Sequence, residues 1–318
     1  MNENTTNLPS YDGLFTAIVP CKNEEAMITI FYDEFVKVMS LFSNPKFEII
    51  FVDDGSTDFT LEKIKELAQN DDRVRYISFS RNFGKESAMY AGFQSAKGDY
   101  IAVMDADLQD PPALLPEMFS KIKNCDCVAT RRITRTEEPP IRTFFAKVFY
   151  KVLNTISSLN FKEGARDFRL IRRNVLNEIL RLGEYNRFVK GMYEWVGFRT
   201  EWIEFENCPR VAGETKWSLW GLLLYSIEAF TSFSTIPLAI VSIVGLSFCL
   251  FSIFAILFVA IRQMLFHNSA FGWTSLVCIL FFLSGLQLFC LGVLGQYISK
   301  IYLESKRRPI YVVKEKSR

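Results

Sequence analysis

Asp105 and Asp107, two acidic residues one position apart, are the first candidates for chemistry in this sequence of 318 residues. They follow an apolar run at residues 100–104, which is typical of a buried strand. Carboxylates at a strand end can face one cation, and Gln109 adds a further oxygen ligand. Hard oxygen ligands suit Mg²⁺ or Mn²⁺. The pattern predicts a divalent-metal site for binding phosphates, although a solvated loop is the alternative for so short a motif.

The elements that position this pair follow from the hydrophobic pattern. Apolar runs at residues 15–20, 47–52, 74–79 and 100–104 alternate with helical patterns at 24–42, 60–69 and 85–96. This alternation predicts an α/β fold with a mostly parallel, Rossmann-like sheet covered by helices. Ligands bind beyond the carboxyl ends of such strands, and three polar junctions fall there, at residues 22–25, 53–58 and 105–110. We expect Asp53 and Asp58 to shape a turn or cap a helix.

Two stretches near the C-terminus, residues 229–261 and 263–299, contain no Asp, Glu, Lys or Arg. Each exceeds the roughly 20 residues that span a bilayer core, and two buried core helices are the alternative. Seven basic residues follow the second stretch, so the positive-inside rule places both flanks in the cytoplasm. The polar start lacks the apolar segment of a signal peptide.

These patterns predict three parts. Residues 1–230 are expected to form a cytoplasmic domain that contains every strand of the sheet. Two transmembrane helices are expected at residues 231–300, and a basic cytoplasmic tail at 301–318. Residues 142–159 form a basic amphipathic pattern and 217–233 are rich in aromatics, so both are expected at the membrane interface. Packing on the sheet is the alternative for the first. The net charge of +2 predicts no nucleic-acid partner, and seven scattered Cys without a CxxC pair predict no disulfide framework.

Six motifs carry a resemblance to a known family. They lie at residues 18–25, 52–58, 81–85, 104–111, 164–170 and 212–216. In order and spacing they resemble family 2 glycosyltransferases, and within them the polyprenyl-phosphate hexosyltransferases, which include bactoprenol glucosyltransferases and dolichol-phosphate mannose synthases. The resemblance implies a GT-A fold and an inverting transfer of a hexose from a nucleotide sugar to undecaprenyl phosphate at the plasma membrane. UDP-glucose is the expected donor, with UDP-N-acetylglucosamine and GDP-mannose as alternatives.

The resemblance also implies roles for individual residues. Asp167, with Asp105 and Asp107, would form the catalytic set, and Asp105, Asp107 and Gln109 would hold Mg²⁺ or Mn²⁺. Arg142 and Lys216 would meet the acceptor phosphate. The nucleotide-sugar pocket would be lined by Pro20, Lys22, Glu24, Val52, Asp54, Asp105, Ala106 and Arg131. Lys22 departs from the family, since many relatives have an aromatic residue there. The alternative for Arg131, Arg142 and Lys216 is a solvated or headgroup-facing charge.

The role of Asp167 stays open between two functions. A phosphate monoester has a second pKa near 6 and is already a nucleophile at neutral pH. We therefore favour an orienting role for Asp167 over proton abstraction, and an ion pair with Arg166 or Arg169 is the structural alternative. Glu194 and Trp195 are expected to border the sugar pocket, with core packing as the alternative for Trp195.

Two other functions compete with this interpretation. A processive polysaccharide synthase would need more spans and a Gln-x-x-Arg-Trp motif, which the sequence lacks. A non-catalytic membrane scaffold would have no reason to keep the acidic and basic residues together. The sequence leaves open whether the protein forms a homo-oligomer.

Overall fold

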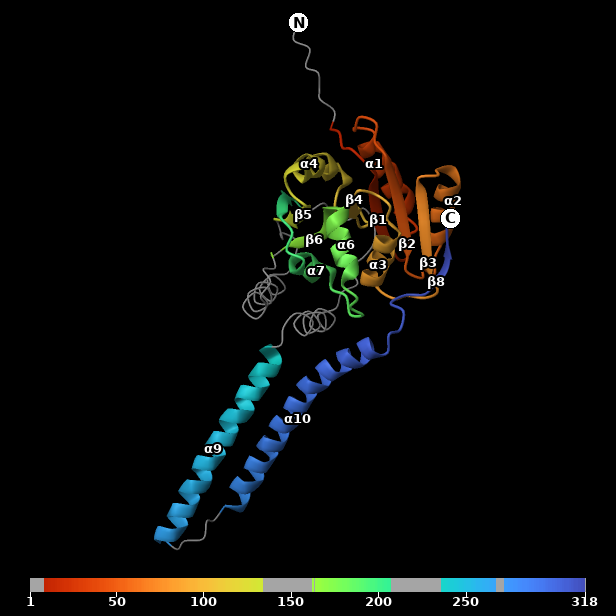
Figure 1. Ribbon diagram of the computed structural model, residues 1–318. Coiled ribbons are helices and arrows are strands. Elements are labelled where there is room, and N and C mark those ends of the chain that lie inside the picture. The colour runs from red at the N-terminus through yellow and green to blue at the C-terminus, as the bar shows by residue number, and fades with distance from the viewer. Residues whose placement is uncertain (1–8, 134–161, 163, 207–235, 267–271, 318) are drawn as a thin grey trace. The chain divides into compact units, whose positions relative to one another are not determined.

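A computed structural model describes residues 9–133, 162, 164–206, 236–266 and 272–317 (Figure 1). The described residues fall into two compact units. The first contains an eight-stranded sheet, and the second contains two long helices. The order of strands in the sheet is β7-β5-β6-β4-β1-β2-β3-β8.

The first half of the sheet has the predicted alternation. Its strands are β1 (Phe15–Cys21), β2 (Phe47–Asp53), β3 (Val74–Phe79) and β4 (Tyr100–Val103), and its helices are α1 (Ile28–Met39), α2 (Thr60–Asn70) and α3 (Lys85–Ser95). β1 pairs in parallel with β2 and β4, and β2 pairs in parallel with β3. All four carboxyl ends therefore lie at one edge, as the polar junctions predicted.

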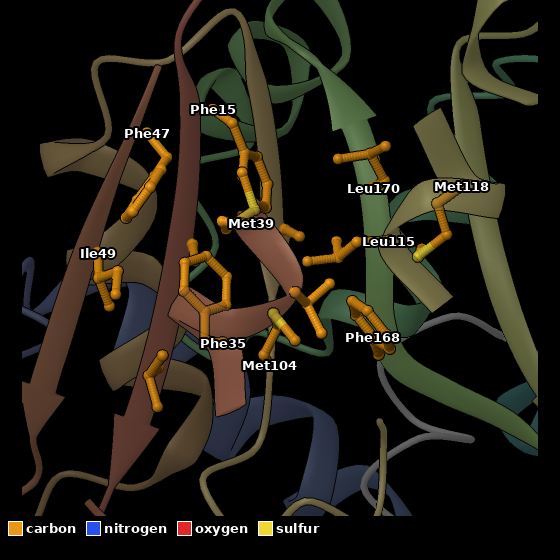
Figure 2. Close-up of a cluster of buried hydrophobic side chains, with 14 of the residues drawn as sticks. Phe15, Phe35, Met39, Phe47, Ile49, Met104, Leu115, Met118, Phe168 and Leu170 are labelled. Carbon is orange, nitrogen blue, oxygen red and sulfur yellow. The ribbon is translucent and has the colours of Figure 1, made fainter. Parts of the chain in front are cut away.

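Side chains alternate along β1 between two cores. Phe15, Ala17 and Val19 belong to one buried cluster, together with Phe35 and other residues of α1 (Figure 2). Ile18 lies in the other cluster, beneath α3, where Gly92 allows close packing. A Cβ at Gly92 would lie 2.2 Å from Cγ2 of Ile18. Each fully buried Phe or Ile contributes about 1.5–3 kcal/mol, so the strand is fixed from both faces.

The second half of the sheet is mixed. Its elements are η1 (Pro112–Leu114), α4 (Leu115–Lys121), η2 (Ile122–Asn124), β5 (Cys127–Arg132), β6 (Ala165–Arg172), α6 (Arg173–Arg181), α7 (Val189–Trp195) and β7 (Thr200–Phe205). β5 and β7 are parallel, whereas β6 is antiparallel to both β4 and β5. Because β6 runs against β4, its first residues lie at the carboxyl end of β4.

The last described residues add a strand that the sequence did not predict. β8 (Val313–Lys316) pairs antiparallel with β3 and closes that edge of the sheet. Tyr311 stacks on Phe79 with ring centroids 4.8 Å apart, and its hydroxyl donates to Gln94 Oε1 at 2.7 Å. The expectation that the sheet is complete within residues 1–230 is therefore wrong, because its edge strand comes from the far end of the chain.

The second unit contains α9 (Ile236–Phe266) and α10 (Trp273–Ser305). Among the described residues, one helical segment, Ile279–Ser305, is long and apolar enough to cross a membrane, and none of its most apolar window is buried. A shorter apolar segment, Leu238–Phe248, lies in α9. The described residues thus contain one candidate membrane-crossing segment, and the second span stays a prediction. The interfacial helices predicted at residues 142–159 and 217–233 lie outside the described residues.

Candidate active site

The loops after β1 and β2 are joined by hydrogen bonds. Asn23 N donates to Ser56 Oγ at 3.0 Å, and Asn23 Oδ1 accepts from Thr57 N at 2.9 Å. Glu24 N donates to Thr60 Oγ1 at 2.8 Å. The two polar junctions therefore form one surface, which carries the exposed side chain of Lys22 and the partly buried side chain of Glu24.

Asp53 and Asp58 stabilise the turn after β2, as expected. Asp53 is buried and accepts from Ser56 N at 3.0 Å and from the Ser78 hydroxyl at 2.8 Å. Asp58 Oδ1 accepts from Thr60 N at 3.1 Å, at the first residue of α2. Both carboxylates therefore accept hydrogen bonds from other residues of the protein.

Asp54 holds the loop between β3 and α3. It is buried and accepts from Phe83 N at 2.7 Å and Gly84 N at 2.9 Å. Burial raises the pKa of Asp54, and these two N–H groups oppose the shift. Gly84 has φ of 96°, a conformation that favours glycine. This arrangement fixes the start of α3, whose first residue is Lys85.

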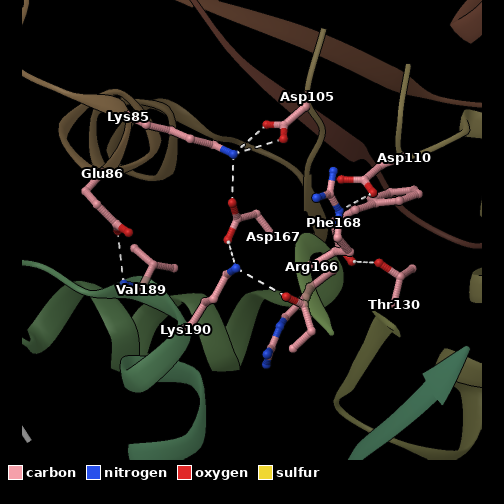
Figure 3. A network of polar contacts seen from close by, with 12 residues as sticks. Lys85, Glu86, Asp105, Asp110, Thr130, Arg166, Asp167, Phe168, Val189 and Lys190 are labelled. Carbon is pink, nitrogen blue, oxygen red and sulfur yellow. Dashed lines mark hydrogen bonds and ion pairs between the residues drawn. The ribbon is translucent and has the colours of Figure 1, made fainter. Parts of the chain in front are cut away.

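Lys85 joins two carboxylates that are far apart in the sequence (Figure 3). Its Nζ lies 2.7 Å from Asp105 Oδ1 and 2.7 Å from Asp167 Oδ2. The pairing of β4 with β6 explains the meeting, since Tyr100 pairs with Arg172 and Ala102 pairs with Leu170. The same register, continued past the end of β4, places Asp105 opposite Asp167.

Asp167 has a second cationic partner on α7. Lys190 Nζ lies 3.5 Å from Asp167 Oδ1 and donates to Ala165 O at 3.2 Å. Glu86 accepts from Val189 N at 3.0 Å, which joins the first turn of α3 to the first turn of α7 (Figure 3). Both lysines thus reach the same carboxylate from helices that are tied together.

The cations around Asp167 keep it ionised. Burial alone would raise the pKa of Asp167, but Lys190, Lys85 and Arg166 more than offset burial and hold this pKa well below its usual range. A carboxylate with so low a pKa is a weak base. The geometry therefore suits Asp167 to orienting and charge stabilisation.

The ion pairs considered for Asp167 from the sequence are wrong. Arg166 Nε instead donates to Asp110 Oδ1 at 2.7 Å, and Arg169 pairs with Glu194 at 3.4 Å. Asp110 is fully buried, and burial raises its pKa to about 6, although the charge of Arg166 opposes the shift. This ion pair joins the start of β6, which carries Asp167, to the loop after β4, which carries Asp105. It therefore helps to hold the two carboxylates in place.

The residues expected to hold a metal lie on the loop after β4. Asp107 Oδ1 accepts from Gln109 N at 3.2 Å, and Leu108 between them has φ of 56°. Within the described part of the chain, no three His, Cys, Asp or Glu side chains gather as a metal site would require. Asp107, Gln109 and Asp105 carry side-chain oxygens, the type of ligand that Mg²⁺ prefers, and these residues would hold the ion.

Other residues predicted from the sequence occupy varied places. Val52 and Ala106 are buried, and the side chain of Val52 packs beneath α3. Pro20 lies near the end of β1, and Arg131 of β5 pairs with Glu204 of β7. Core packing of Trp195 is excluded, because this residue is 61% exposed. Arg142 and Lys216 lie outside the described residues.

Sequence reasoning missed Lys85 and Lys190. Lys85 closes one of the six motifs, at residues 81–85, so the motif was a signal although no role followed from it. Lys190 belongs to none of the six motifs. Its part in the site depends on α7 lying against the start of α3, which only the tertiary structure reveals.

Comparisons with known proteins identify the family of this chain. The sequence model described as Glycosyl transferase family 2 matches residues 16–180. A Bactoprenol glucosyl transferase of Shigella phage SfV is 40% identical, over 93% of this chain and 97% of the relative. The chain belongs to glycosyl transferase family 2. It is a glycosyltransferase.

Further relatives and a solved structure extend the comparison. A Prophage bactoprenol glucosyl transferase homolog of Escherichia coli K12 is 39% identical, over 93% of this chain and 97% of the relative. A Putative glycosyltransferase, CsbB, of Bacillus subtilis 168 is 38% identical, over 95% and 92%. The structure of a mannosyltransferase, PcManGT, from Pyrobaculum calidifontis is similar in fold, with a TM-score of 0.50 at 18% identity over 93% of this chain and 86% of that one. These comparisons agree with the GT-A-like, mostly parallel sheet expected from the sequence.

Proposed function

We propose that this glycosyltransferase moves a hexose, glucose from UDP-glucose, to undecaprenyl phosphate at the cytoplasmic face of the membrane, with inversion at the anomeric carbon. The observation that carries the proposal is the bridge from Asp105 through Lys85 to Asp167. It sets a carboxylate of the nucleotide-binding strand ends beside a second carboxylate on β6. Relatives named bactoprenol glucosyl transferase, at 39–40% identity over nearly the whole chain, support the acceptor and the sugar.

The acceptor supplies its own nucleophile. A lipid phosphate monoester is largely dianionic at neutral pH. Its oxygen attacks the anomeric carbon from the face opposite the diphosphate, so the new C–O bond forms as the bond to the diphosphate oxygen breaks. No proton has to be removed, which matches the low pKa of Asp167. The role of Asp167 is to orient the reacting groups and to stabilise positive charge that develops on the sugar.

The loop after β4 is suited to the diphosphate. Asp107, with Gln109 and Asp105, would hold Mg²⁺ or Mn²⁺. A divalent ion there supplies positive charge for the departing diphosphate. The mannosyltransferase of similar fold was solved in complex with GDP-Man and Mn²⁺, which supports the same choice of donor class and metal.

The apolar C-terminal helices suit a lipid acceptor. The segment Ile279–Ser305 is long enough to cross a bilayer, and a second span in residues 231–300 would return the chain to its starting side. The excess of Lys and Arg after residue 299 favours a cytoplasmic catalytic domain. The phosphate of a membrane-embedded polyprenol would then be presented at the surface on which the domain works.

The test is transfer by the purified full-length protein. Undecaprenyl phosphate in detergent or vesicles is incubated with radiolabelled UDP-glucose, UDP-N-acetylglucosamine or GDP-mannose, and labelled lipid is separated by chromatography. We expect labelled lipid with UDP-glucose, no product in EDTA, and recovery when Mg²⁺ or Mn²⁺ is added. Product from another donor would correct the sugar alone. Absence of lipid product with every donor would contradict the proposed acceptor reaction.

A further inference from the structure

Lys85 lies between Asp105 and Asp167 and forms an ion pair with each of them. Its Nζ lies 2.7 Å from Asp105 Oδ1 and 2.7 Å from Asp167 Oδ2. In the proposed reaction, the nucleotide diphosphate lies on the side of Asp105 and the acceptor phosphate on the side of Asp167. The hexose is transferred from the diphosphate to the acceptor phosphate, so it has to lie close to Lys85, which separates the two carboxylates.

The position of Lys85 is rigid. The backbone just before it donates two hydrogen bonds to buried Asp54, from Phe83 N and Gly84 N. The residue just after it, Glu86, accepts from Val189 N of α7 at 3.0 Å. A side chain that is anchored on both flanks presents its ammonium group at a fixed point, as a binding site requires.

The ammonium group is accessible to a ligand. The side chain of Lys85 is 42% exposed, whereas those of Asp105 and Asp167 are 23% and 20% exposed. An ammonium has three N–H donors. Lys85 Nζ lies 2.7 and 3.0 Å from the two oxygens of Asp105, which can share one N–H, and Asp167 takes a second. A ligand that enters the site can therefore meet Lys85 directly while the bridge stays in place.

The local charge does not attract a phosphate. Asp105 and Asp167 carry two negative charges, and Lys85 and Lys190 balance them with two positive ones. A group of side chains without net charge offers a phosphate no net attraction, whereas a hydroxyl group needs only a hydrogen-bond donor, because it accepts through its oxygen. The positive charge for the phosphates has to come from other groups.

We propose that Lys85 binds the transferred hexose by donating a hydrogen bond to one of its hydroxyl groups, while its bridge keeps Asp105 and Asp167 at a fixed separation. This inference rests on the proposed function, since it assumes a nucleotide-sugar donor. Lys85 is then a residue that distinguishes a nucleotide sugar from the free nucleotide. A site built to hydrogen-bond a hydroxyl discriminates strongly against ligands that lack it.

Calorimetric titration of the full-length protein in detergent with Mg²⁺ tests this contact, with UDP-glucose and UDP as separate ligands. For Lys85→Met we expect the Kd for UDP-glucose to rise about 10-fold or more, the range for a charge-assisted hydrogen bond. The Kd for UDP should stay nearly unchanged, which also shows that the nucleotide pocket is folded. Lys37→Met is the matched control, because Lys37 pairs with Glu34 on the exposed surface of α1.

The outcomes separate this inference from the proposed function. Equal weakening of UDP and UDP-glucose would place Lys85 on the diphosphate and overturn the inference, as would unchanged binding of both. A wild-type protein that binds UDP but no nucleotide sugar would overturn the proposed function and this inference together. If Lys85→Met does not fold, Lys85→Arg keeps the charge but moves the donors, and the same comparison of the two ligands decides.

Discussion

Two groups of acidic residues follow strand ends of the same sheet, and their partners differ. Asp53, at the last position of β2, and Asp54 and Asp58, just after it, accept hydrogen bonds largely from backbone N–H groups of their own and neighbouring loops. Asp105 and Asp167 are held by the ammonium groups of Lys85 and Lys190. A carboxylate bound by backbone donors is committed to the fold, whereas one held by a flexible side chain can exchange that partner for a ligand.

This difference predicts different consequences of the same substitution. Asp to Asn preserves shape and removes charge in either group. In the first group it should lower stability and leave the chemistry nearly intact, and in the second it should lower turnover and leave stability nearly intact. Substitutions at Asp167 and Asp54 test this division, and those at Asp107 and Glu86 extend it to the loop after β4 and to the first turn of α3.

Asp107→Asn should have the largest effect. It removes one charge from the loop expected to hold the metal, and loss of one such electrostatic contact typically lowers kcat by about 10²–10³-fold. Steady-state transfer to undecaprenyl phosphate measures the change, and the midpoint of thermal unfolding should match that of the wild type. Wild-type turnover in this variant, or full activity in EDTA, would remove Asp107 and the metal from the mechanism.

Asp167→Asn should follow, with kcat lower by about 100-fold. Binding of UDP should hardly change, because the proposed reaction puts Asp167, an ion-pair partner of Lys85, on the side of the acceptor. Comparison of kcat with the calorimetric Kd for UDP separates the two effects. Equal loss of both would mean that Asp167 supports the nucleotide pocket instead.

Asp54→Asn should change stability more than rate. The buried carboxylate accepts from two N–H groups, and the amide of Asn can accept with one atom only, so about 1.5–3 kcal/mol of the free energy of unfolding is at stake. Thermal unfolding in detergent measures the loss, and Asp72→Asn on the exposed surface is the control. An unchanged unfolding midpoint together with weaker UDP binding would show that Asp54 contacts the nucleotide, as the family resemblance implies.

The sequence predicted the first half of the sheet well because its signals are local. Expected strands at residues 15–20, 47–52 and 74–79 match β1, β2 and β3 within one residue, and helix α1 (Ile28–Met39) lies within the helical pattern expected at residues 24–42. The strand-end rule then located the site. Each of these inferences needs only neighbouring residues and a parallel βα alternation.

The remaining features depend on contacts between distant residues. Lys85 meets Asp167 across 82 positions, and β8 meets β3 across more than 230. No local pattern gives the direction of β6, which determines that Asp167 lies opposite Asp105. The expected pair of Asp167 with Arg166 was mistaken because neighbours in sequence on a strand point to opposite faces. Arg169 lies two positions from Asp167, and its partner Glu194 comes from α7, 25 positions away.

Glu86→Gln should give the smallest effect, visible only in the pH dependence of stability. Burial raises the pKa of Glu86 to about 7 from an ordinary value of 4.5, and the charge of Asp167 adds to this, while Val189 N, Lys85 and Lys190 oppose it. Between pH 4.5 and 7 the folded state therefore binds more protons than the unfolded state, so this group lowers stability as pH rises through that window. Gln cannot titrate, but its side-chain carbonyl can still accept from Val189 N.

The unfolding midpoint of Glu86→Gln, relative to the wild type, should accordingly be higher at pH 8 than at pH 5. Differential scanning calorimetry at the two pH values measures this difference, and Glu34→Gln on the exposed surface of α1 is the control. Turnover should change less than in Asp167→Asn, because Glu86 ties α3 to α7 without touching either carboxylate of the bridge. An equal shift of the midpoint at both pH values would mean that Glu86 is ionised throughout. Glu86 would then contribute no pH dependence to stability, and the expected effect of its burial would be wrong.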